Sequence, residues 1–556
     1  MATFDHNKYR INPTPKLTDR TWPDKQITQA PAWCSVDLRD GNQALINPMS
    51  VAQKHRMFDK LLALGFKEIE VGFPAASQTD FDFVREIIEQ NKIPEDVTIQ
   101  VLVQARDHLI EQTFRALEGV KRAIVHVYNS TSTIQRERVF AMDKQAIKQI
   151  AVQGAEKVQS EAMKYPNTIW QFQYSPESFS QTETDYAIEV CNAVIDVWQN
   201  QPQPVIINLP ATVEVNSPNA FADQVEYFCR QVKNREQIII SLHTHNDRGC
   251  AVASAELGLL AGADRIEGTL LGNGERTGNM DIVTMAMNFY SQGIDPQLDL
   301  LDIDSIVEVV KACTELPVHP RHPYAGELVF TAFSGSHQDA IKKSLARQQA
   351  DEPWQVAYLP INPEDINRSY EAVIRINSQS GKGGVAYIVE QALNMQMPRW
   401  MQIEFSQVVQ QFSEATGKEV SAEQVRQLFV ETYQSRGWQL QAYQASRSGE
   451  VEHLTVMLAE GDRQQQLSGE GQGLLAVMSD MLSVEMGVNI VITEYSESTQ
   501  QAANNAVAQC FVQVNIGGKR FGGFGQSQDI VDASLKALIS ACNRSVVAAS
   551  ELPLAC

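Results

Sequence analysis

The sequence lacks the features that would place the chain in a membrane, outside the cell or on nucleic acid. No stretch of 18 apolar residues occurs and the N-terminus is polar, so neither a membrane span nor a signal peptide is expected. The eight cysteines are scattered and form no CxxC pair, as is typical of thiols in a reducing compartment. A net charge of −21, from 46 Lys and Arg against 67 Asp and Glu, opposes binding to a phosphate backbone. We therefore expect a cytoplasmic protein that binds neither membranes nor nucleic acid.

The first half of the chain alternates eight short apolar runs with amphipathic stretches. Val, Ile and Leu dominate the runs, as in strands that are buried on both faces of a parallel sheet. Eight strand–helix pairs over about 250 residues predict a (β/α)8 barrel, or TIM barrel, whereas an open doubly wound sheet would have fewer repeats and a glycine-rich first turn. The predicted strands are residues 34–38, 67–73, 98–104, 123–128, 169–174, 204–209, 238–243 and 264–270.

Two further parts follow the predicted barrel, which with an N-terminal extension takes residues 1–325. Residues 326–437 begin beside a proline-rich stretch, contain a helical pattern at 423–434 and predict mostly helical linker subdomains. Residues 438–556 contain an internal repeat, because 464–482 resembles 519–538. Each copy is expected to be a strand, a Gly-x-Gly turn and an amphipathic helix. With strands predicted at 440–446, 451–459, 489–496 and 508–516, we expect an α+β domain of two βββα units.

Polar side chains follow six of the predicted barrel strands, and such barrels keep their active sites at the C-terminal ends of the strands. One polar residue after a strand is usually a loop cap or a solvated side chain. Six strand ends that share this property are much harder to explain in that way. The candidates are Arg39 and Asp40, His126, Ser175 and Glu177, Asn208 and Thr212, His243 and His245, and Glu275 and Asn279.

The strongest chemical signal is a His-x-His pair at the end of the seventh strand. Residues i and i+2 of a strand point to the same face, so His243 and His245 can reach one ion. Asp40, at the neighbouring first strand end, would complete a set of two imidazoles and one carboxylate. Such a set suits Zn²⁺, Mn²⁺ or Fe²⁺ and leaves positions for substrate. The alternative is one exposed histidine beside one histidine that is satisfied by hydrogen bonds.

Three motifs resemble the 2-isopropylmalate synthase family, within the wider class of acyl-CoA-condensing and lyase barrels: LRDGNQA (38–44), LHTHNDRG (242–249) and GNGERTGN (272–279). Further matches occur in the family's order, at 72–85, 174–179, 335–341 and 370–384. The short motifs at 242–249 and 272–279 are shared with sister enzymes, whereas the segment 370–384 is more specific to this family. The resemblance spans nearly the whole chain.

The resemblance implies an acyltransferase that joins acetyl-CoA to 2-oxoisovalerate and hydrolyses the thioester, in the first committed step of leucine biosynthesis. It implies Asp40, His243 and His245 as ligands of a divalent metal (Zn, Mn or Mg), with Asn279 near a fourth position and potassium as a candidate activator. A metal that is chelated by the 2-oxo acid would polarise its carbonyl group.

The same resemblance assigns roles to the remaining candidates. Arg39 would stabilise the charge that develops on the oxo-acid oxygen. His126, Ser175, Thr212 and Glu275 would bind substrate. Three residues are acid/base candidates, and which of them takes the proton from the acetyl methyl group stays open: Glu177, His337 and Tyr370.

Two implications of the resemblance concern assembly and regulation. His337 and Tyr370 lie beyond the barrel, and the family places this region over the barrel mouth of the partner in a homodimer. The C-terminal domain would bind leucine as a feedback inhibitor. The loop at 498–506 contains no glycine, although glycines are usual there in the family, so we expect weakened inhibition.

Several other functions fit parts of this pattern. The nearest is a sister synthase that uses another 2-oxo acid, such as a citramalate or homocitrate synthase. A metal-dependent aldolase or lyase would cleave the carbon–carbon bond instead. An Fe(II) oxygenase uses similar ligands for redox chemistry, and a non-catalytic amino-acid sensor is the last alternative.

Overall fold

The computed structural model describes the chain except for residues 1–3, 333–334, 369–392, 394, 417–419, 435–436, 501–506 and 551–556. The chain divides into two compact units, Met1–Val329 with Pro363–Asn367, and Phe330–Asn362 with Arg368–Cys556. The boundaries predicted at 325 and 437 stay predictions. No helix in the described ranges is long and apolar enough to cross a membrane.

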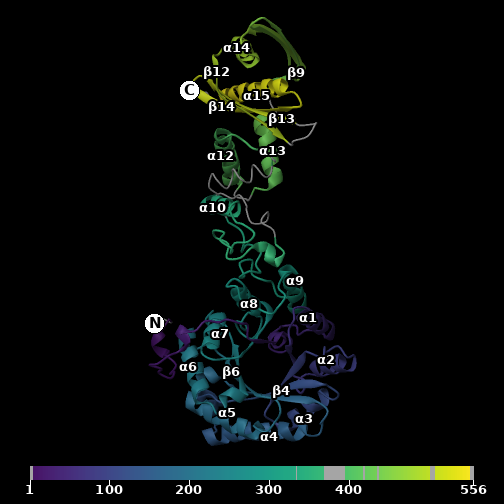
Figure 1. The fold of residues 1–556 in the computed structure, drawn as a ribbon, viewed down its shortest axis with the longest axis vertical. Helices are drawn as coiled ribbons and strands as arrows, with labels where there is room; N and C mark the ends of the chain where they lie inside the picture. Colours follow the sequence, from purple (N-terminus) through teal and green to yellow (C-terminus); the bar gives the residue numbers. More distant parts are fainter. Residues whose placement is uncertain are drawn as a thin grey trace. The chain divides into compact units, whose positions relative to one another are not determined.

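The first unit contains a closed eight-stranded barrel in the order β1 to β8, and the prediction of a (β/α)8 barrel is confirmed (Figure 1). Neighbouring strands are parallel, and β1 closes the barrel by pairing with β8, where Ser35 lies opposite Gly268. The strands are β1 Ala32–Ser35, β2 Glu68–Gly72, β3 Thr98–Gln104, β4 Arg122–Ser130, β5 Ile169–Glu177, β6 Val205–Ala211, β7 Ile238–Thr244 and β8 Arg265–Gly268.

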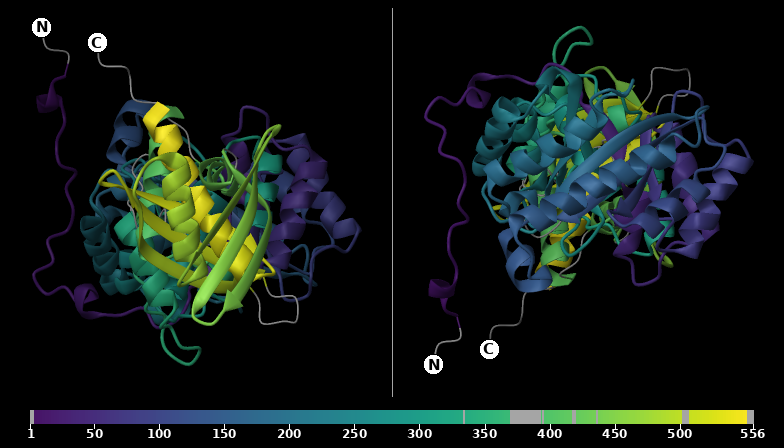
Figure 2. Two further views of the ribbon diagram at one scale, coloured as in Figure 1. Left: turned by 90° about the horizontal axis from the view of Figure 1, so that it is seen from above. Right: turned by 90° about the horizontal axis from the view of Figure 1, so that it is seen from below.

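Helices surround this sheet, as the teal and blue ribbons show from below (Figure 2, right panel). Their apolar faces are buried against the strands; α1, for example, buries Met57, Phe58 and Leu61 and begins with a capping box at Ser50. The barrel helices are α1 Val51–Ala63, α2 Gln78–Glu89, α3 Asp107–Ala116, α4 Lys144–Ala162, α5 Thr184–Trp198, α6 Pro218–Gln231, α7 Ala251–Leu260 and α8 Ile282–Tyr290, and α9 Ile303–Thr314 follows them.

The first strand is shorter than the sequence predicted. It ends at Ser35 instead of residue 38, and Asp37–Gly41 forms a single helical turn. The cause is Val36, whose carbonyl oxygen accepts hydrogen bonds from the backbone N–H groups of Arg39, Asp40 and Gly41 at 3.2, 2.9 and 3.1 Å. This turn brings two adjacent candidate residues, Arg39 and Asp40, to the barrel mouth.

The second unit begins with helices, so the prediction of a helical middle is confirmed. The helices described before its C-terminal strands are α10 Gly335–Leu345, α12 Arg399–Thr416 and α13 Ala422–Tyr433. Helices α12 and α13 share an apolar core with Phe511 and Phe524 of the C-terminal strands. Glu404 of α12 also accepts a hydrogen bond from the backbone N–H of Gly522 at 3.1 Å.

The C-terminal domain contains two antiparallel three-stranded sheets, each followed by a helix, which confirms the prediction of two βββα units. The left panel of Figure 2 shows their helices, α14 in green and α15 in yellow, beside the strands. The sheet orders are β11-β10-β9 and β12-β13-β14. The elements are β9 Gln439–Ser448, β10 Val451–Glu460, β11 Arg463–Gly471, α14 Leu474–Met486, β12 Ile490–Gln500, β13 Val507–Ile516, β14 Lys519–Ser527 and α15 Ile530–Ser550.

The Gly-x-Gly pairs were predicted as turns, and this prediction is wrong, because both pairs lie within strands β11 and β14. Their role is close packing. A Cβ atom built on Gly523 or Gly525 would come within 3.0 Å of backbone atoms of α15. A Cβ on Gly469 would come within 3.0 Å of the Met481 side chain of α14. Glycine therefore lets each helix lie directly on its sheet.

Candidate active site

A cavity of about 270 Å³ opens at the C-terminal ends of the barrel strands. It brings together side chains that are far apart in the sequence, as expected for a barrel mouth. Leu102, Tyr128, Asn208, Pro210 and Arg276 contribute to its wall. Asn208 is one of the predicted candidates, and nine further predicted site residues line the cavity: Arg39, Asp40, His126, Ser175, Glu177, Thr212, His243, His245 and Glu275.

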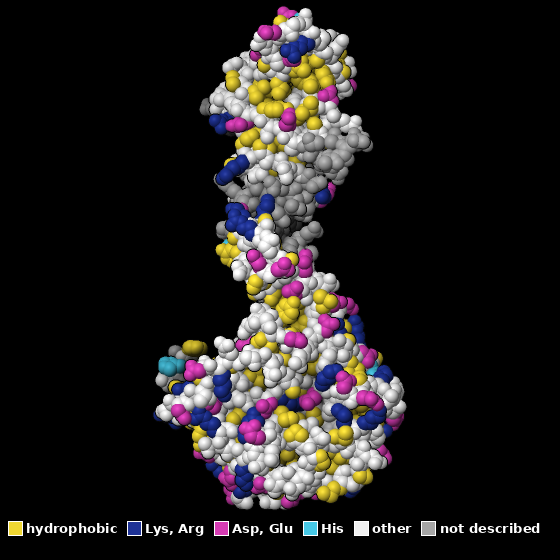
Figure 3. All heavy atoms as spheres, viewed as in Figure 1, with side chains coloured by type: hydrophobic (Ala, Val, Ile, Leu, Met, Phe, Trp, Pro, Cys, Tyr) yellow, Lys and Arg dark blue, Asp and Glu magenta, His cyan; other side chains and the backbone are white. Residues whose placement is uncertain are grey.

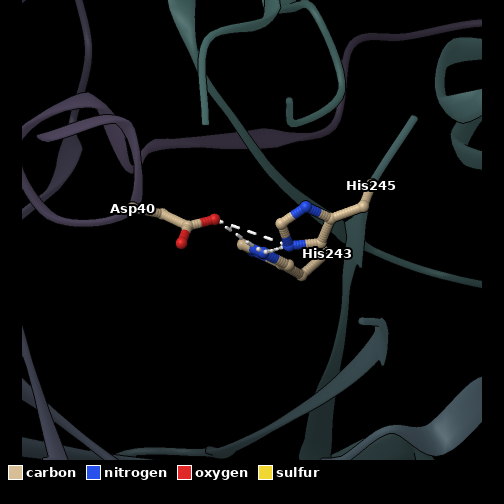
Figure 4. A group of neighbouring side chains, drawn as sticks. All are labelled: Asp40, His243 and His245. Atoms are coloured by element: carbon tan, nitrogen blue, oxygen red, sulfur yellow. Dashed lines mark hydrogen bonds and ion pairs between the residues drawn. The ribbon is translucent and has the colours of Figure 1, made fainter. Parts of the chain in front are cut away.

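Asp40, His243 and His245 converge on one point of this cavity (Figure 4). Nε2 of His243 lies 3.1 Å from Nε2 of His245. Oδ2 of Asp40 lies 3.3 Å from the first nitrogen and 3.5 Å from the second. Two ligands at about 2.1 Å from one ion are separated by about 3.0 Å at a right angle and about 3.4 Å at the tetrahedral angle. The three atoms therefore have the spacing of a metal-ligand set.

Unpartnered atoms around this point also fit a metal ion. Among the described residues, Oδ2 of Asp40 and Oδ1 of Asn279 are buried without a hydrogen-bond partner. Asn279 pairs with His245 in an isolated β-bridge, and its Nδ2 atom donates to the Asn273 carbonyl oxygen at 3.0 Å. Buried polar atoms without partners are costly. Two imidazoles and a carboxylate suit Zn²⁺ or Mn²⁺, and Asn279, beside His245, has a further oxygen that is free to accept.

The electrostatics of the three residues favour a bound positive charge. Burial opposes ionisation of Asp40, but Arg39 and the two histidines hold the pKa of this carboxyl group well below its usual range. Burial also opposes protonation of His243, yet the carboxylates of Asp40 and Glu267 raise its pKa to about 9. Burial and the neighbouring His243 lower the pKa of His245 to about 4. The ionised carboxylate of Asp40 and the low pKa of His245 therefore suit a bound cation at this point.

Arg39 is fixed beside this site by two carboxylates. Its Nη1 atom lies 2.9 Å from Oδ1 of Asp40, and its Nε atom donates to Oε1 of Glu70. Glu70 is completely buried in β2 and also contacts Nδ1 of His126 at 2.9 Å. Although burial disfavours its charge, Arg39 and His126 lower the pKa of Glu70. The guanidinium group is therefore held in one orientation at the cavity wall.

The next strands supply hydroxyl and amide groups. Ser175 of β5 donates to Nε2 of His126 at 2.7 Å and accepts from Nδ2 of Asn208 at 3.0 Å. The hydroxyl oxygen of Thr212 accepts from the backbone N–H of Ser178 at 2.9 Å, so its own proton remains available. Glu177, at the end of β5, accepts a hydrogen bond from the Ser130 hydroxyl group.

The remaining candidates are distributed differently. Glu275 lines the cavity and lies within hydrogen-bond reach of Gln43, at 3.5 Å. His337 belongs to the second unit, where it is exposed on α10 and stacks on Tyr358 with ring centroids 4.0 Å apart. Tyr370 and the segment 370–384 lie outside the described residues.

Two buried glutamates of the site were missed by the sequence analysis. Glu70 and Glu267 lie inside the apolar runs that became β2 and β8, and both side chains are buried beneath the cavity. The available signal was a carboxylate in the middle of a strand that is buried on both faces. Such a group needs fixed partners.

The comparisons with known proteins cover nearly the whole chain. Residues 30–310 match the HMGL-like family, residues 327–390 match "Alpha-isopropylmalate synthase, post-catalytic domain-like", and residues 419–546 match the "LeuA allosteric (dimerisation) domain". A 2-isopropylmalate synthase of Pseudomonas entomophila is 54% identical over 98% of both chains. One of Rhodospirillum rubrum is 53% identical over 98% of this chain and 99% of its own.

Solved structures of lower similarity match about half of the chain. A hydroxymethylglutaryl-CoA lyase of Pseudomonas aeruginosa is 20% identical, with a TM-score of 0.43, over 52% of this chain and 95% of its own. An HMG-CoA lyase of Brucella melitensis is 17% identical, with a TM-score of 0.42, over 52% of this chain and 100% of its own.

Proposed function

The chain belongs to the 2-isopropylmalate synthase family, and from this membership we propose how its barrel residues carry out the condensation. The enzyme is an acyltransferase of leucine biosynthesis that joins acetyl-CoA to 2-oxoisovalerate and gives 2-isopropylmalate and CoA. The observation that carries the proposed mechanism is the convergence of Asp40, His243 and His245 on one point of the cavity.

Asp40, His243 and His245 would hold a divalent metal, with Asn279 at a fourth position. When bound, the metal acts as a Lewis acid toward the carbonyl group of the 2-oxo acid. Support comes from the ligand spacing and from the unpartnered oxygens of Asp40 and Asn279. The choice among Zn²⁺, Mn²⁺ and Mg²⁺, and any activation by K⁺, belongs to the same proposal.

The cavity wall offers complementary groups for a branched 2-oxo acid. His126, Ser175, Thr212 and Glu275 provide polar contacts, and Leu102 and Pro210 provide apolar surface for the isopropyl group. Arg39 is fixed at this wall, so its positive charge can stabilise the oxygen that becomes negative as the new carbon–carbon bond forms.

The condensation requires a base and then water. A base removes one proton from the acetyl methyl group, the resulting carbanion attacks the carbonyl carbon, and the former carbonyl oxygen gains a proton. Water then cleaves the thioester, which releases the free thiol of CoA and the new carboxylate. Glu177 is our candidate base, because it lines the cavity at the end of β5. His337 and Tyr370 remain candidates for the other proton transfers.

A free-thiol assay with a panel of 2-oxo acids tests the substrate. We expect CoA release to be fastest with 2-oxoisovalerate and slow with pyruvate and 2-oxoglutarate. Acetyl-CoA without an oxo acid serves as the control for simple hydrolysis. Equal or faster release with pyruvate or 2-oxoglutarate would indicate a sister synthase.

The C-terminal domain matches a family that is described as allosteric and dimerising. We propose that it joins two chains into a homodimer and binds leucine as a feedback inhibitor. Exposed apolar residues support an interface in this domain, and Figure 3 shows hydrophobic side chains gathered on one of its faces. Val484 is 85% exposed and Val491 48%. A cytoplasmic location is also proposed, supported by seven described cysteines that are all free.

A further inference from the structure

Eight side chains at the barrel mouth form a ring of polar contacts, of which seven are hydrogen bonds or ion pairs and the eighth, between His243 and Asp40, joins two of the proposed metal ligands. Each member contacts the next, and the last contacts the first. Seven of the contact distances lie between 2.7 and 3.3 Å, and the contact of Arg39 with Glu70 is shorter. Seven of the eight strands contribute, directly or through the turn after β1. In order, the ring is Asp40, Arg39, Glu70, His126, Ser175, Asn208, Glu267 and His243.

The direction of donation in one half of the ring is set by Glu70. Nδ1 of His126 lies 2.9 Å from a Glu70 oxygen, which can only accept, so this nitrogen carries the proton. Nε2 of His126 therefore accepts from the Ser175 hydroxyl group. The single proton of Ser175 is thereby used, and its oxygen is free to accept from Nδ2 of Asn208.

The other half of the ring is set by Glu267 in the same way. Its Oε2 atom accepts from Nδ2 of Asn208 at 3.2 Å and from Nδ1 of His243 at 3.0 Å. The proton of the neutral imidazole of His243 therefore lies on Nδ1. Its Nε2 atom keeps a lone pair, which faces Oδ2 of Asp40 and Nε2 of His245.

Glu267 cannot change this arrangement easily, because its second oxygen is also occupied. Oε1 accepts from Arg265, Gln173 and Gln100 at 2.8, 2.7 and 3.2 Å. Only 1% of Glu267 is exposed, and Arg265 is completely buried. Five donors thus hold one carboxylate, and the acceptor that faces His243 has a fixed direction.

We propose that Glu267 is a positioning residue that sets the metal-binding tautomer of His243 and, through Asn208 and Ser175, aligns the polar wall of the oxo-acid pocket. The inference rests on the metal site proposed above. It differs from a purely structural role as the counter-ion of Arg265, because it links metal affinity to this one carboxylate. Hydrogen-bond partners of metal-bound histidines typically change metal affinity by about 10- to 100-fold.

Glu267→Gln tests this role. The amide of glutamine has one acceptor and one donor, so it cannot accept at Oε1 and also accept from His243 and Asn208. If its NH₂ group faces His243, the imidazole must carry its proton on Nε2, where the metal would bind. We expect metal affinity, measured by competition with a chromophoric chelator, to fall about 10- to 100-fold. KM for 2-oxoisovalerate should rise more than KM for acetyl-CoA.

Glu68→Gln is the matched control. Glu68 accepts from Nε of the same Arg265 and, among the described contacts, bonds neither His243 nor Asn208. Its substitution should leave metal affinity within about twofold of wild type. Equal losses in the two variants would assign Glu267 to charge balance with Arg265 and overturn the proposal, as would wild-type metal affinity in folded Glu267→Gln.

Glu267→Asp covers the case in which the glutamine variant fails to fold. It keeps the negative charge beside Arg265 but withdraws the carboxylate from His243, so metal affinity should again fall. Wild-type affinity in this variant would overturn the proposal. If the wild-type protein itself binds no metal, or if His245→Ala binds it normally, the proposed metal site fails instead. The two failures are therefore distinguishable.

Discussion

The barrel mouth and the C-terminal domain are organised by different physical means. The barrel buries charged side chains in its interior, including Glu70, Arg265 and Glu267. Among the described residues after 438, no charged side chain is buried, and the core consists of residues such as Val456, Val512 and Leu538. Buried charge is costly unless it is paired. The barrel nevertheless keeps these buried charges directly beneath the proposed metal ligands, which indicates that they serve the site.

This comparison distinguishes residues that orient catalytic or metal-binding groups from residues that determine how closely helices and sheets pack. In the barrel, a carboxylate determines which nitrogen of a histidine carries a proton. In the C-terminal domain, glycines determine how closely a helix approaches a sheet. Substitutions in the first region should change activity and metal binding most, and those in the second should change stability or regulation.

The largest effect is expected when a proposed metal ligand is removed. His243→Ala or His245→Ala leaves two of the three convergent ligands, so turnover should fall below about 1% of wild type and bound metal should be lost. Metal content and thiol release measure both effects after metal-free purification and reconstitution.

His453→Ala is the corresponding control in the C-terminal domain, where this histidine is half-exposed on β10 and pairs with Glu470. It should leave both readouts unchanged. Wild-type activity in either barrel variant would remove the metal site from this strand end and erase the proposed difference between the two regions.

The second prediction asks whether the barrel works alone. His337 lies in the second unit, and we propose that it serves the barrel of the partner chain. Asp40→Ala and His337→Ala should each be inactive, yet mixed dimers should regain activity. Random pairing makes half of the dimers mixed, each with one intact site, so about a quarter of wild-type activity is expected.

The mixture must be compared with each variant dissociated and reassociated alone. Verified heterodimers without activity would show that each site is built within one chain. Mass spectrometry of differently tagged chains verifies the pairing.

Much of the fold was predictable because its repeats have clear periods. The eight apolar runs predicted the barrel, and the His-x-His spacing predicted that His243 and His245 face the same side of their strand. The turn at residues 37–41 was not predictable, because it depends on one carbonyl oxygen, that of Val36, accepting three N–H groups. From strand propensity alone, the first strand is predicted to continue to residue 38.

The missed parts of the site have a different cause. Glu70 and Glu267 are single carboxylates in apolar runs, and sequence does not show which side of the barrel each one faces. Their partners lie on other strands, such as His126 on β4 and His243 on β7. Only closure of the barrel brings these groups together. The glycines of β11 and β14 were read as turn residues because sequence does not show the helix that lies on them.

The third prediction compares the two repeats of the C-terminal domain. Gly525→Ala should destabilise this domain by about 2 kcal/mol, because its Cβ would meet backbone atoms of Ala533 and Ala537 that cannot move aside. Gly469→Ala should cost less than about 1 kcal/mol, because the flexible Met481 side chain can shift. Denaturant unfolding followed by circular dichroism measures the difference, and equal losses would mean that backbone contact is not the cause.

The smallest effect is expected for leucine, which tests whether the C-terminal domain regulates the barrel at all. Inhibition requires only that leucine bind the less active state more tightly. Residues 498–506 contain no glycine; residues 498–500 end β12, and Gln501 and Ala503 lie outside the described residues. Side chains at these two positions, where the family usually has glycines, would reduce the space and backbone freedom available to a ligand. We therefore expect inhibition that is present but weak. Calorimetry and thiol release, titrated with leucine in parallel, measure binding and coupling separately, with isoleucine as a control of similar size. Tight binding with strong inhibition would show that these side chains do not obstruct the site. No binding at all would mean that the domain serves assembly, or another ligand, instead of leucine.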